Sequence, residues 1–276
     1  MGSKAWSVRV WGVRGSHPVP QKEFFGYGGN TSCISLESGE KRIIFDGGSG
    51  LIPLGDELNR MEEIKEIHLL ISHAHIDHVI GLLGFKPFWD KGKRIHLYGS
   101  EREGIPFAQQ LERLMGKPFW PLGLLDFRAD IRVHEVKAGD SFFLGESSQR
   151  VNVGTFLGRH PGGSTLYRLD MDGKRFVYGL DCDPDQELIP SFRDFARNAD
   201  MMVWDASFAP GDKKEGWGHS TWEEGIRFRR SAGIRRMLMA HYSREYSDKF
   251  LEKQEELMRE RDEGSLFARE GMKLLL

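Results

Sequence analysis

Hydrophobic and polar residues alternate along this chain in patterns that predict short strands mixed with helices. The run from Ile67 to Ile71 is almost continuously apolar, which is typical of a strand buried on both faces. Two further stretches alternate on either side of short turns and predict β-hairpins. Their strands cover residues 32–37, 41–46, 164–171 and 174–179. The second pair is joined by Asp172-Gly173, a favoured two-residue hairpin turn.

Apolar residues at helical spacing predict six helices between and after these strands. They cover residues 53–61, 78–90, 105–115, 186–199, 221–232 and 244–262. The fifth helix has a start signal, because the sequence STWE at residues 220–223 fits a capping box. In that motif the Ser220 and Glu223 side chains would satisfy free backbone donors. Helices and strands mix over the whole length, so we predict an α/β fold in which helices cover sheets.

The composition is that of one folded domain without a membrane segment. With 276 residues, of which 39% are hydrophobic, the chain can bury a full core. It contains no internal repeat or long linker, so we expect a single domain over residues 1–276. No stretch approaches the roughly 20 apolar residues that span a membrane, and the N-terminus lacks a secretory signal pattern. Cys33 and Cys182 make no disulfide framework, which favours a cytoplasmic protein.

The candidate chemistry is concentrated in the sequence HAHIDH at residues 73–78, directly after the buried strand. While the chain stays extended, His73 and His75 project to the same side, because side chains alternate with a period of two. Asp77 and His78 follow where the helical pattern begins, so four ligand-type side chains converge at the end of one strand. Imidazoles and a carboxylate are ligands that suit Zn²⁺. We therefore predict a metal site here.

This HxHxDH pattern resembles the signature of the metallo-β-lactamase superfamily, and the other motifs stand in the expected order. Asp46 in IIFDGGSG resembles the aspartate of the first motif, which supports the site. The later motifs are His160 in GRHPGGS, Asp181 in VYGLDCD and His241 in MLMAHYS. The resemblance covers nearly the whole chain. It implies a four-layer αββα sandwich, in which two mixed β-sheets face each other with helices outside.

The same resemblance implies a centre with two metal ions. One ion would be held by His73, His75 and His160, the other by Asp77, His78 and His241, with Asp181 and a hydroxide shared between them. We expect Zn²⁺, with Mn²⁺ and Fe²⁺ as alternatives, because affinity alone does not select the metal. Flavin-linked di-iron relatives carry glutamate at the position of His75. The histidine here therefore favours hydrolysis over redox chemistry.

A second pair of residues indicates the branch of the superfamily that this chain resembles. Asp205 in MMVWDASF follows an apolar run typical of a strand, and His219 in GWGHST precedes a predicted helix. The pair resembles the phosphodiesterase branch, which includes tRNase Z, although tRNase Z typically has glutamate at the position of Asp205. The resemblance implies that His219, oriented by Asp205, protonates the leaving group as a general acid. Asp77 and Asp181 complete the expected catalytic set.

These residues favour a phosphodiesterase that acts on a small substrate, such as a cyclic nucleotide or a short oligonucleotide. The formal net charge of −2 gives no sign of the basic surface that long nucleic acid requires. The nearest alternative is a tRNA 3′-processing endonuclease, which needs an extended arm to clamp tRNA. Residues 99–130 are the most insertion-like stretch. They are more typical of a compact lid or wall than of an arm.

Two other classes stay open as alternatives. A thioester or lactone hydrolase like glyoxalase II would share the metal ligands, but it leaves the GHS motif unexplained. A non-catalytic sensor module would use its metals structurally, whereas structural zinc sites are usually closed and mononuclear. Dimers are common in the superfamily, so the resemblance also allows a homodimer.

Several aromatic and histidine residues outside these motifs are weaker candidates. Those that could stack on a base are Trp11, Phe25, Tyr27, Trp89, Trp120 and Trp217. Each of them also suits the core or a loop. Asn30 either touches substrate or shapes its glycine-rich loop. The histidines that fit no motif, and that we expect to be strand residues with structural partners, are His68, His96 and His134.

Overall fold

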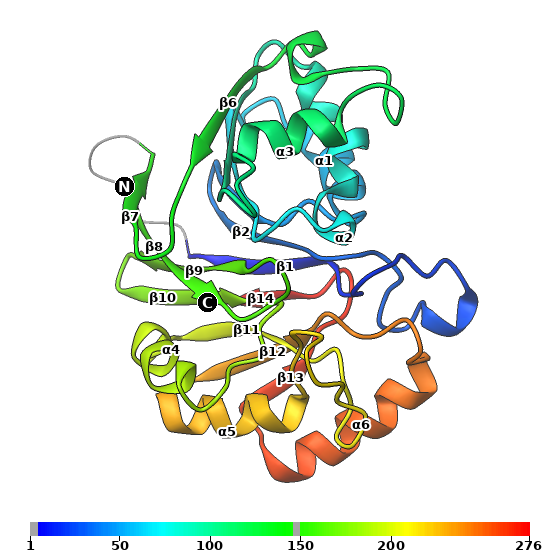
Figure 1. Cartoon of the computed structure of the whole chain (residues 1–276), viewed down its shortest axis with the longest axis vertical. Coiled ribbons are helices and arrows are strands. Elements are labelled where there is room, and N and C mark those ends of the chain that lie inside the picture. Colours follow the sequence, from blue (N-terminus) through cyan, green and yellow to red (C-terminus); the bar gives the residue numbers. More distant parts are fainter. Residues whose placement is uncertain (1–4, 146–149) are drawn as a thin grey trace.

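The structure is a computed structural model, and it describes residues 5–145 and 150–276. Within these residues, fourteen strands form two seven-stranded sheets (Figure 1). The first sheet has the order β14 (Lys273–Leu275), β1 (Ser7–Gly12), β2 (Cys33–Ser38), β3 (Lys41–Phe45), β4 (Glu66–Leu70), β5 (Arg94–Gly99) and β6 (Asp130–Glu135). The second has the order β13 (Ser265–Phe267), β12 (Arg236–Ala240), β11 (Met201–Asp205), β10 (Lys174–Gly179), β9 (Ser164–Met171), β8 (Val151–Gly158) and β7 (Ser141–Leu144). Both sheets are mixed, because each joins antiparallel pairs to a run of parallel strands.

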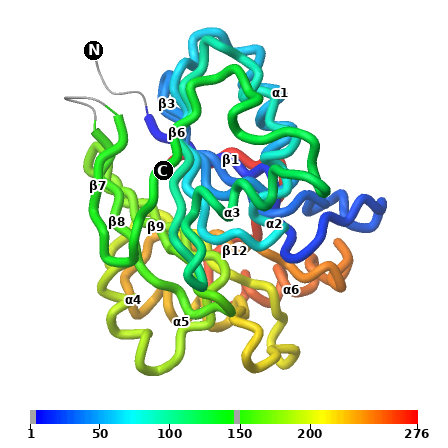
Figure 2. Tube along the Cα trace, turned by 45° about the horizontal axis from the view of Figure 1, so that its top comes forward, coloured from blue at the N-terminus to red at the C-terminus, as the bar shows by residue number. Residues whose placement is uncertain are grey.

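Helices cover the outer faces of both sheets. The helices on the first sheet are α1 (Leu51–Leu58), α2 (Ile76–Val79) and α3 (Phe107–Leu114), and those on the second are α4 (Leu188–Ala196), α5 (Trp222–Ala232) and α6 (Asp248–Arg261). Short 3₁₀ turns are η1 (Lys22–Phe24), η2 (Ile80–Gly84), η3 (Lys86–Trp89) and η4 (Leu124–Asp126). Figure 1 shows α1 and α3 on one side of the strands and α4 and α5 on the other, and Figure 2 shows the same chain with its top turned forward. The predicted four-layer αββα sandwich is confirmed.

Hydrophobic side chains fill the space between the layers. Between the sheets, the Phe45 ring of β3 packs on Phe176 of β10 with ring centroids 5.2 Å apart. A second cluster joins Leu54 of α1, Leu69 of β4 and Leu111 of α3 on the outer face of the first sheet. The apolar run of β4 supplies side chains to both clusters, because Leu70 belongs to the first and Leu69 to the second. The strand is therefore buried on both faces, as predicted.

The predicted hairpins are confirmed. The strands β2 and β3 pair antiparallel, as do β9 and β10. In the second hairpin, φ is 50° at Asp172 and 75° at Gly173. Both values are positive, as a two-residue turn that matches the twist of its strands requires.

The helix predicted over residues 78–90 is wrong. The chain instead forms α2, which ends at Val79, and then the 3₁₀ turns η2 and η3. Two backbone groups that a continuous helix would use are bonded elsewhere, because Gly47 donates to the His78 carbonyl and Gly81 donates to the Gly47 carbonyl. Pro87 also lacks the backbone donor that a helix interior needs.

Two helix starts differ from the prediction, and side-chain caps explain both. The helix predicted over residues 244–262 begins at Asp248, because the Ser247 hydroxyl accepts from a backbone N–H of the first turn. The capping box of α5 is formed by Thr221 and Glu224, one residue later than predicted. Ser220 is not the cap, since its hydroxyl donates to the Cys182 carbonyl. The other three predicted helices are present with shifted ends.

Candidate metal centre

The predicted site residues gather where parallel strands of both sheets end. Asp46 follows β3 and His73 lies three residues after β4 in the first sheet. Asp181 and His241 follow β10 and β12 in the second sheet, and Asp205 is the last residue of β11. The carboxyl ends of parallel strands are where α/β sheets commonly place their binding sites.

Three of these residues have a backbone conformation that is rare outside glycine. The φ angle is 58° at Asp46, 57° at Asp181 and 67° at His241. This left-handed region is costly for a residue with a Cβ atom, and it persists where the surrounding structure enforces it, often at functional sites. Each of the three lies within two residues of a strand end, where the chain turns sharply.

A first cluster of histidines converges beside α2. The His75 Nδ1 atom lies 2.9 Å from His73 Nε2 and 3.1 Å from His160 Nε2. His73 is buried, whereas His75 is exposed. Burial lowers the pKa of all three imidazoles. Neutral rings offer lone pairs, so this cluster has the donor set of a divalent cation site.

A second cluster lies next to the first and is entirely buried. His78 Nε2 lies 3.2 Å from His241 Nε2, and His241 Nε2 lies 3.3 Å from Asp77 Oδ2. The backbone N–H of Ser16 also donates to Asp77 Oδ2 at 2.6 Å. Two imidazole nitrogens and a carboxylate oxygen therefore face a common point, as ligands of one ion do.

Asp181 lies between the two clusters, with one carboxylate oxygen toward each. Its Oδ2 atom is 3.7 Å from His73 Nε2 and 3.6 Å from His160 Nε2. Its Oδ1 atom is 3.2 Å from both His78 Nε2 and His241 Nε2, and it is buried without a hydrogen bond. Burial opposes the charge of Asp181, but the two imidazoles His241 and His78 hold the pKa of this carboxyl well below its usual range.

The residues of both clusters fit a pair of divalent metal ions. Opposed imidazole nitrogens at about 3 Å and an orphaned buried carboxylate oxygen are each costly unless a cation lies among them. The donor set of nitrogens and carboxylate oxygens suits zinc and other transition metals. The seven predicted ligands are thus brought together in the arrangement that a dinuclear centre needs.

Asp46, the predicted supporting residue, contacts this centre from the first sheet. Its Oδ2 atom lies 2.6 Å from His78 Nδ1 and accepts from the Tyr178 hydroxyl at 2.7 Å. Its Oδ1 atom accepts from the Ser72 backbone N–H at 2.7 Å. Asp46 therefore fixes the His78 ring so that Nε2 points to the centre, a role that outer residues play at metal sites.

Several supporting residues were missed by sequence reasoning. The Ser207 hydroxyl lies 2.7 Å from His241 Nδ1 and 2.7 Å from the His241 carbonyl. The Gly218 carbonyl lies 3.2 Å from His160 Nδ1. Ser207 is two residues from Asp205 and Gly218 is next to His219, so proximity to a predicted site residue was the available signal.

The predicted dyad is present at the rim of the centre. His219 Nδ1 lies 2.8 Å from Asp205 Oδ2, and the Ser207 backbone N–H donates to Asp205 Oδ1 at 2.9 Å. The His219 ring stacks on that of His241 with centroids 5.1 Å apart. Burial disfavours the charged imidazole, but Asp205 outweighs it and raises the pKa of His219 to about 9. The Asp205 carboxylate thus favours the protonated form of His219 beside the centre.

A pocket of about 290 Å³ opens next to the first cluster. It is lined by His73 and His75 and by residues of the predicted lid or wall, including Arg102, Ile105 and Gln110. The Arg102 guanidinium donates to the Gly163 carbonyl and to Thr165 Oγ1, which ties this wall to the loop that carries His160. Residues 102–110 therefore form a wall, as the sequence indicated for part of the 99–130 stretch.

The weaker candidates have mostly structural surroundings. Asn30 bonds Glu270 through its backbone and side chain and accepts from Ser49, so it shapes its loop. Trp11 and Tyr27 are buried in the core. The aromatic candidates that stay exposed are Phe25, Trp89 and Trp217.

Three further histidines stack on one another on neighbouring strands of the first sheet. This histidine stack consists of His68, His96 and His134 with Tyr98. His96 lies 4.8 Å from the His68 ring and 5.1 Å from the His134 ring, centroid to centroid. Its Nδ1 atom bonds His134 at 2.8 Å and its Nε2 atom bonds Glu66 at 3.0 Å. The prediction of strand residues with structural partners agrees with these contacts.

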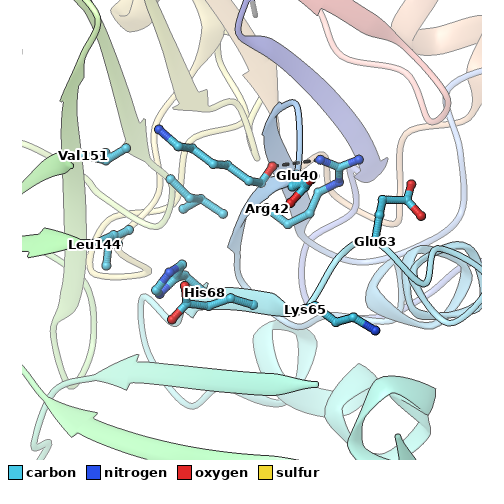
Figure 3. Close-up of a pocket in the computed structure, with 11 residues that line it drawn as sticks. Glu40, Arg42, Glu63, Lys65, His68, Leu144 and Val151 are labelled. Atoms are coloured by element: carbon cyan, nitrogen blue, oxygen red, sulfur yellow. Dashed lines mark hydrogen bonds between the residues drawn. The ribbon is translucent and has the colours of Figure 1, made fainter. Parts of the chain in front are cut away.

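A second pocket, of about 310 Å³, lies beside the histidine stack. His68 lines it together with charged residues of both signs, among them Arg42, Glu63 and Lys65 (Figure 3). Apolar side chains of the second sheet, such as Leu144, close its other side. None of the predicted ligands lines this pocket.

Known proteins resemble this chain over most of its length. Residues 41–242 match the model of the β-lactamase superfamily domain. A ribonuclease Z of Pyrococcus furiosus is 22% identical, with 86% of each chain covered. A ribonuclease Z of Haloarcula marismortui is 27% identical, with 87% of each chain covered. The metallo-β-lactamase fold protein YhfI from Bacillus subtilis has a TM-score of 0.71 at 19% identity, covering 98% of this chain and 99% of that one.

Neither buried cysteine forms a disulfide, and no helix in the described part of the chain could cross a membrane. The family model covers well over half of the chain, and the likeness to YhfI extends over the whole fold. The chain is therefore a member of the β-lactamase superfamily with the metallo-β-lactamase fold, in the branch that contains ribonuclease Z.

Proposed function

We propose that this metal-dependent hydrolase cleaves small phosphodiesters, such as cyclic nucleotides or short oligonucleotides, at the candidate metal centre. The observation that carries the proposal is the Asp205–His219 dyad, because the 2.8 Å contact between Asp205 Oδ2 and His219 Nδ1 would orient the imidazole as a proton donor at the rim of the centre. Hydrolysis of an unactivated phosphodiester expels an alkoxide, and an alkoxide needs a proton. A positioned acid is therefore the part that this reaction requires beyond its metal ions.

Two divalent ions would be held by the two clusters, with Asp181 between them. The ligands are His73, His75 and His160 for one ion and Asp77, His78 and His241 for the other. When bound, the ions supply a water nucleophile that is active near neutral pH and positive charge for the phosphate oxygens. We propose Zn²⁺ as the native metal, with Mn²⁺ and Fe²⁺ as alternatives.

The protein residues hold and deliver the proton. Asp205 binds His219 at Nδ1, which leaves Nε2 as the proton donor to the leaving oxygen. Ser207 bonds the other Asp205 oxygen through its backbone N–H, so the carboxylate cannot rotate away from His219. The dyad works with aspartate in place of the glutamate of the related nucleases, since the contact is already of hydrogen-bond length.

The surroundings of the centre favour a small substrate. The wall of residues 102–110 and the adjoining pocket of about 290 Å³ suit a nucleotide-sized molecule. A tRNA 3′-processing endonuclease is the second candidate, favoured by the similarity to proteins named ribonuclease Z. Within residues 99–130, helix α3 packs on β6, which favours a compact wall over an extended arm.

The proposal is tested by turnover of bis(p-nitrophenyl) phosphate with protein loaded in turn with zinc, manganese and iron. We expect metal-dependent hydrolysis that the double variant His73→Ala/His75→Ala loses by at least about 10³-fold. His134→Ala, which removes a histidine from the histidine stack, is the matched control and should keep the activity. Absence of turnover with every metal would contradict the phosphodiester assignment, and thioesters and lactones would then be the substrates to test.

A competition assay separates the two candidates. Cleavage of 2′,3′-cyclic nucleotides that an excess of precursor tRNA does not inhibit supports the small-substrate proposal. Cleavage of precursor tRNA at its 3′ end, with a higher kcat/KM than any cyclic nucleotide, supports the endonuclease instead.

A further inference from the structure

A large aromatic side chain is exposed beside the proposed proton donor. Trp217 lies two residues before His219, and 56% of its surface is accessible. An indole ring in water is costly when nothing covers it, and a tryptophan next to a catalytic group is a common contact for ligands. Packing within the protein therefore does not explain why Trp217 is exposed at this place.

This loop has a defined shape because both of its ends are tied to the site. The φ angle is 76° at both Gly216 and Gly218, the residues on either side of Trp217. A Cβ atom at Gly218 would lie 2.6 Å from His160 Nδ1, so no other residue fits there. At the other end, Lys213 Nζ bonds Asp183 at 2.6 Å. Trp217 is thus presented at a fixed place relative to the centre.

Aromatic contacts connect Trp217 to the dyad. Phe208 is buried and makes edge contacts with both rings, with centroids 6.4 Å from Trp217 and 6.0 Å from His219. The Lys214 ammonium lies 4.5 Å from the Trp217 centroid, a cation–π contact that holds the indole in place. The indole therefore lies one side chain beyond the group that protonates the leaving oxygen.

We propose that Trp217 is a stacking platform for the base of a nucleoside leaving group. In the hydrolysis, a water oxygen joins phosphorus and releases one proton to solvent, the bond from phosphorus to the sugar oxygen breaks, and that oxygen takes a proton from His219, which solvent then restores. The leaving oxygen and the sugar that carries it lie on the His219 side, so the base of that sugar would reach toward Trp217. The inference rests on the proposed function and narrows it to nucleotide phosphodiesters, with stacking that tolerates any base.

The test compares two cyclic phosphodiesters that differ in the base. The substrates are 2′,3′-cyclic adenosine monophosphate and glycerol 1,2-cyclic phosphate, and the readout is the ratio of their kcat/KM values. In Trp217→Ala we expect this ratio to fall about 5- to 150-fold, mainly because the KM of the nucleotide rises. This range corresponds to the free energy of stacking one base on an aromatic side chain. Trp217→Phe should keep most of the preference. An unchanged ratio in Trp217→Ala would overturn the inference.

A binding measurement separates the inference from the proposed function. Adenosine 3′-monophosphate should quench tryptophan fluorescence of the wild-type protein, bind Trp217→Phe with less quenching, and bind Trp217→Ala more weakly. That result supports the stacking site even if neither cyclic substrate is hydrolysed. Equal affinity of the wild-type protein and Trp217→Ala would overturn it, whatever the activity.

Discussion

Histidine rings gather in two places in this protein, and the two places differ in what surrounds the rings. At the candidate metal centre, imidazole nitrogens face one another and the buried Asp181 Oδ1 has no hydrogen bond. In the histidine stack, His96 has both nitrogens bonded, to His134 and to Glu66, and the rings lie face to face. The first arrangement is that of cation ligands, whereas the polar atoms of His96 in the second are paired with protein groups.

The candidate metal centre and the histidine stack differ in the number of buried carboxylates. Asp46, Asp77, Asp181 and Asp205 are all buried around the centre. The stack has one partly exposed carboxylate, Glu66, at its end. Buried carboxylates are stable only when paired with positive charge or hydrogen-bond donors. A concentration of histidines therefore indicates a metal site only together with buried carboxylates that the protein leaves partly unpaired.

The largest expected difference between the two groups of histidines is in catalysis, and it concerns His219. We expect His219→Ala to lower kcat for a cyclic nucleotide by 10²- to 10⁴-fold, since it removes the general acid. With bis(p-nitrophenyl) phosphate the loss should be several-fold at most, because p-nitrophenolate leaves without a proton. Steady-state kinetics on both substrates measure the two losses.

The control for this prediction is His96→Leu, which changes a buried histidine away from the centre. It should lower the stability of the protein and leave both kcat values close to those of the wild type. Equal losses on the two substrates in His219→Ala would contradict a role in proton transfer and would assign the residue to holding the metal ligands in place.

The centre was predictable from the sequence because its ligands stand in short motifs at strand ends. HAHIDH at residues 73–78 is contiguous, and each of Asp46, Asp181 and His241 follows an apolar run. Strand direction alone then brings them together. The same local logic predicted both hairpins, since a turn such as Asp172-Gly173 depends only on its own backbone.

What could not be predicted depends on contacts between distant segments. Tyr178 bonds Asp46 from the opposite sheet, and nothing in its own neighbourhood marks it. The helix predicted over residues 78–90 was broken by backbone bonds to Gly47, which lies more than thirty residues away. Propensity and periodicity report local preference, and tertiary hydrogen bonds override them.

A smaller effect is expected at Ser207, which orients the predicted metal ligand His241. With Nε2 of His241 turned to the centre, Nδ1–H donates to the Ser207 hydroxyl, whose own proton goes to the His241 carbonyl. Ser207→Ala removes this orientation, and we expect one of two zinc ions to bind 10- to 100-fold more weakly. Competition titration against a chromophoric chelator measures both affinities.

Ser207→Thr keeps the hydroxyl and is the matched control, with zinc affinity near that of the wild type. If Ser207→Ala bound both ions as tightly as the wild type, the hydroxyl would have no part in positioning His241.

The smallest expected effect concerns the histidine stack and its dependence on pH. Burial, with the nearby His96 and His134, lowers the pKa of His68 to about 3. In the unfolded chain this group takes a proton below about pH 6.5, while in the folded protein it stays neutral, so stability is lost as the pH falls. Tyr98 and Glu66 face the same rings, and only the carboxylate of Glu66 favours their protonation.

His68→Leu removes this titrating group, so the variant should lose less stability on acidification than the wild type. We expect a difference of about 1 kcal/mol between about pH 7 and about pH 5.5, from urea unfolding of both proteins at each pH. The histidines of the centre titrate equally in both proteins and cancel in the comparison. Parallel losses in the two proteins would mean that His68 takes up a proton in the folded state, and that the stack, like the centre, tolerates positive charge among its rings.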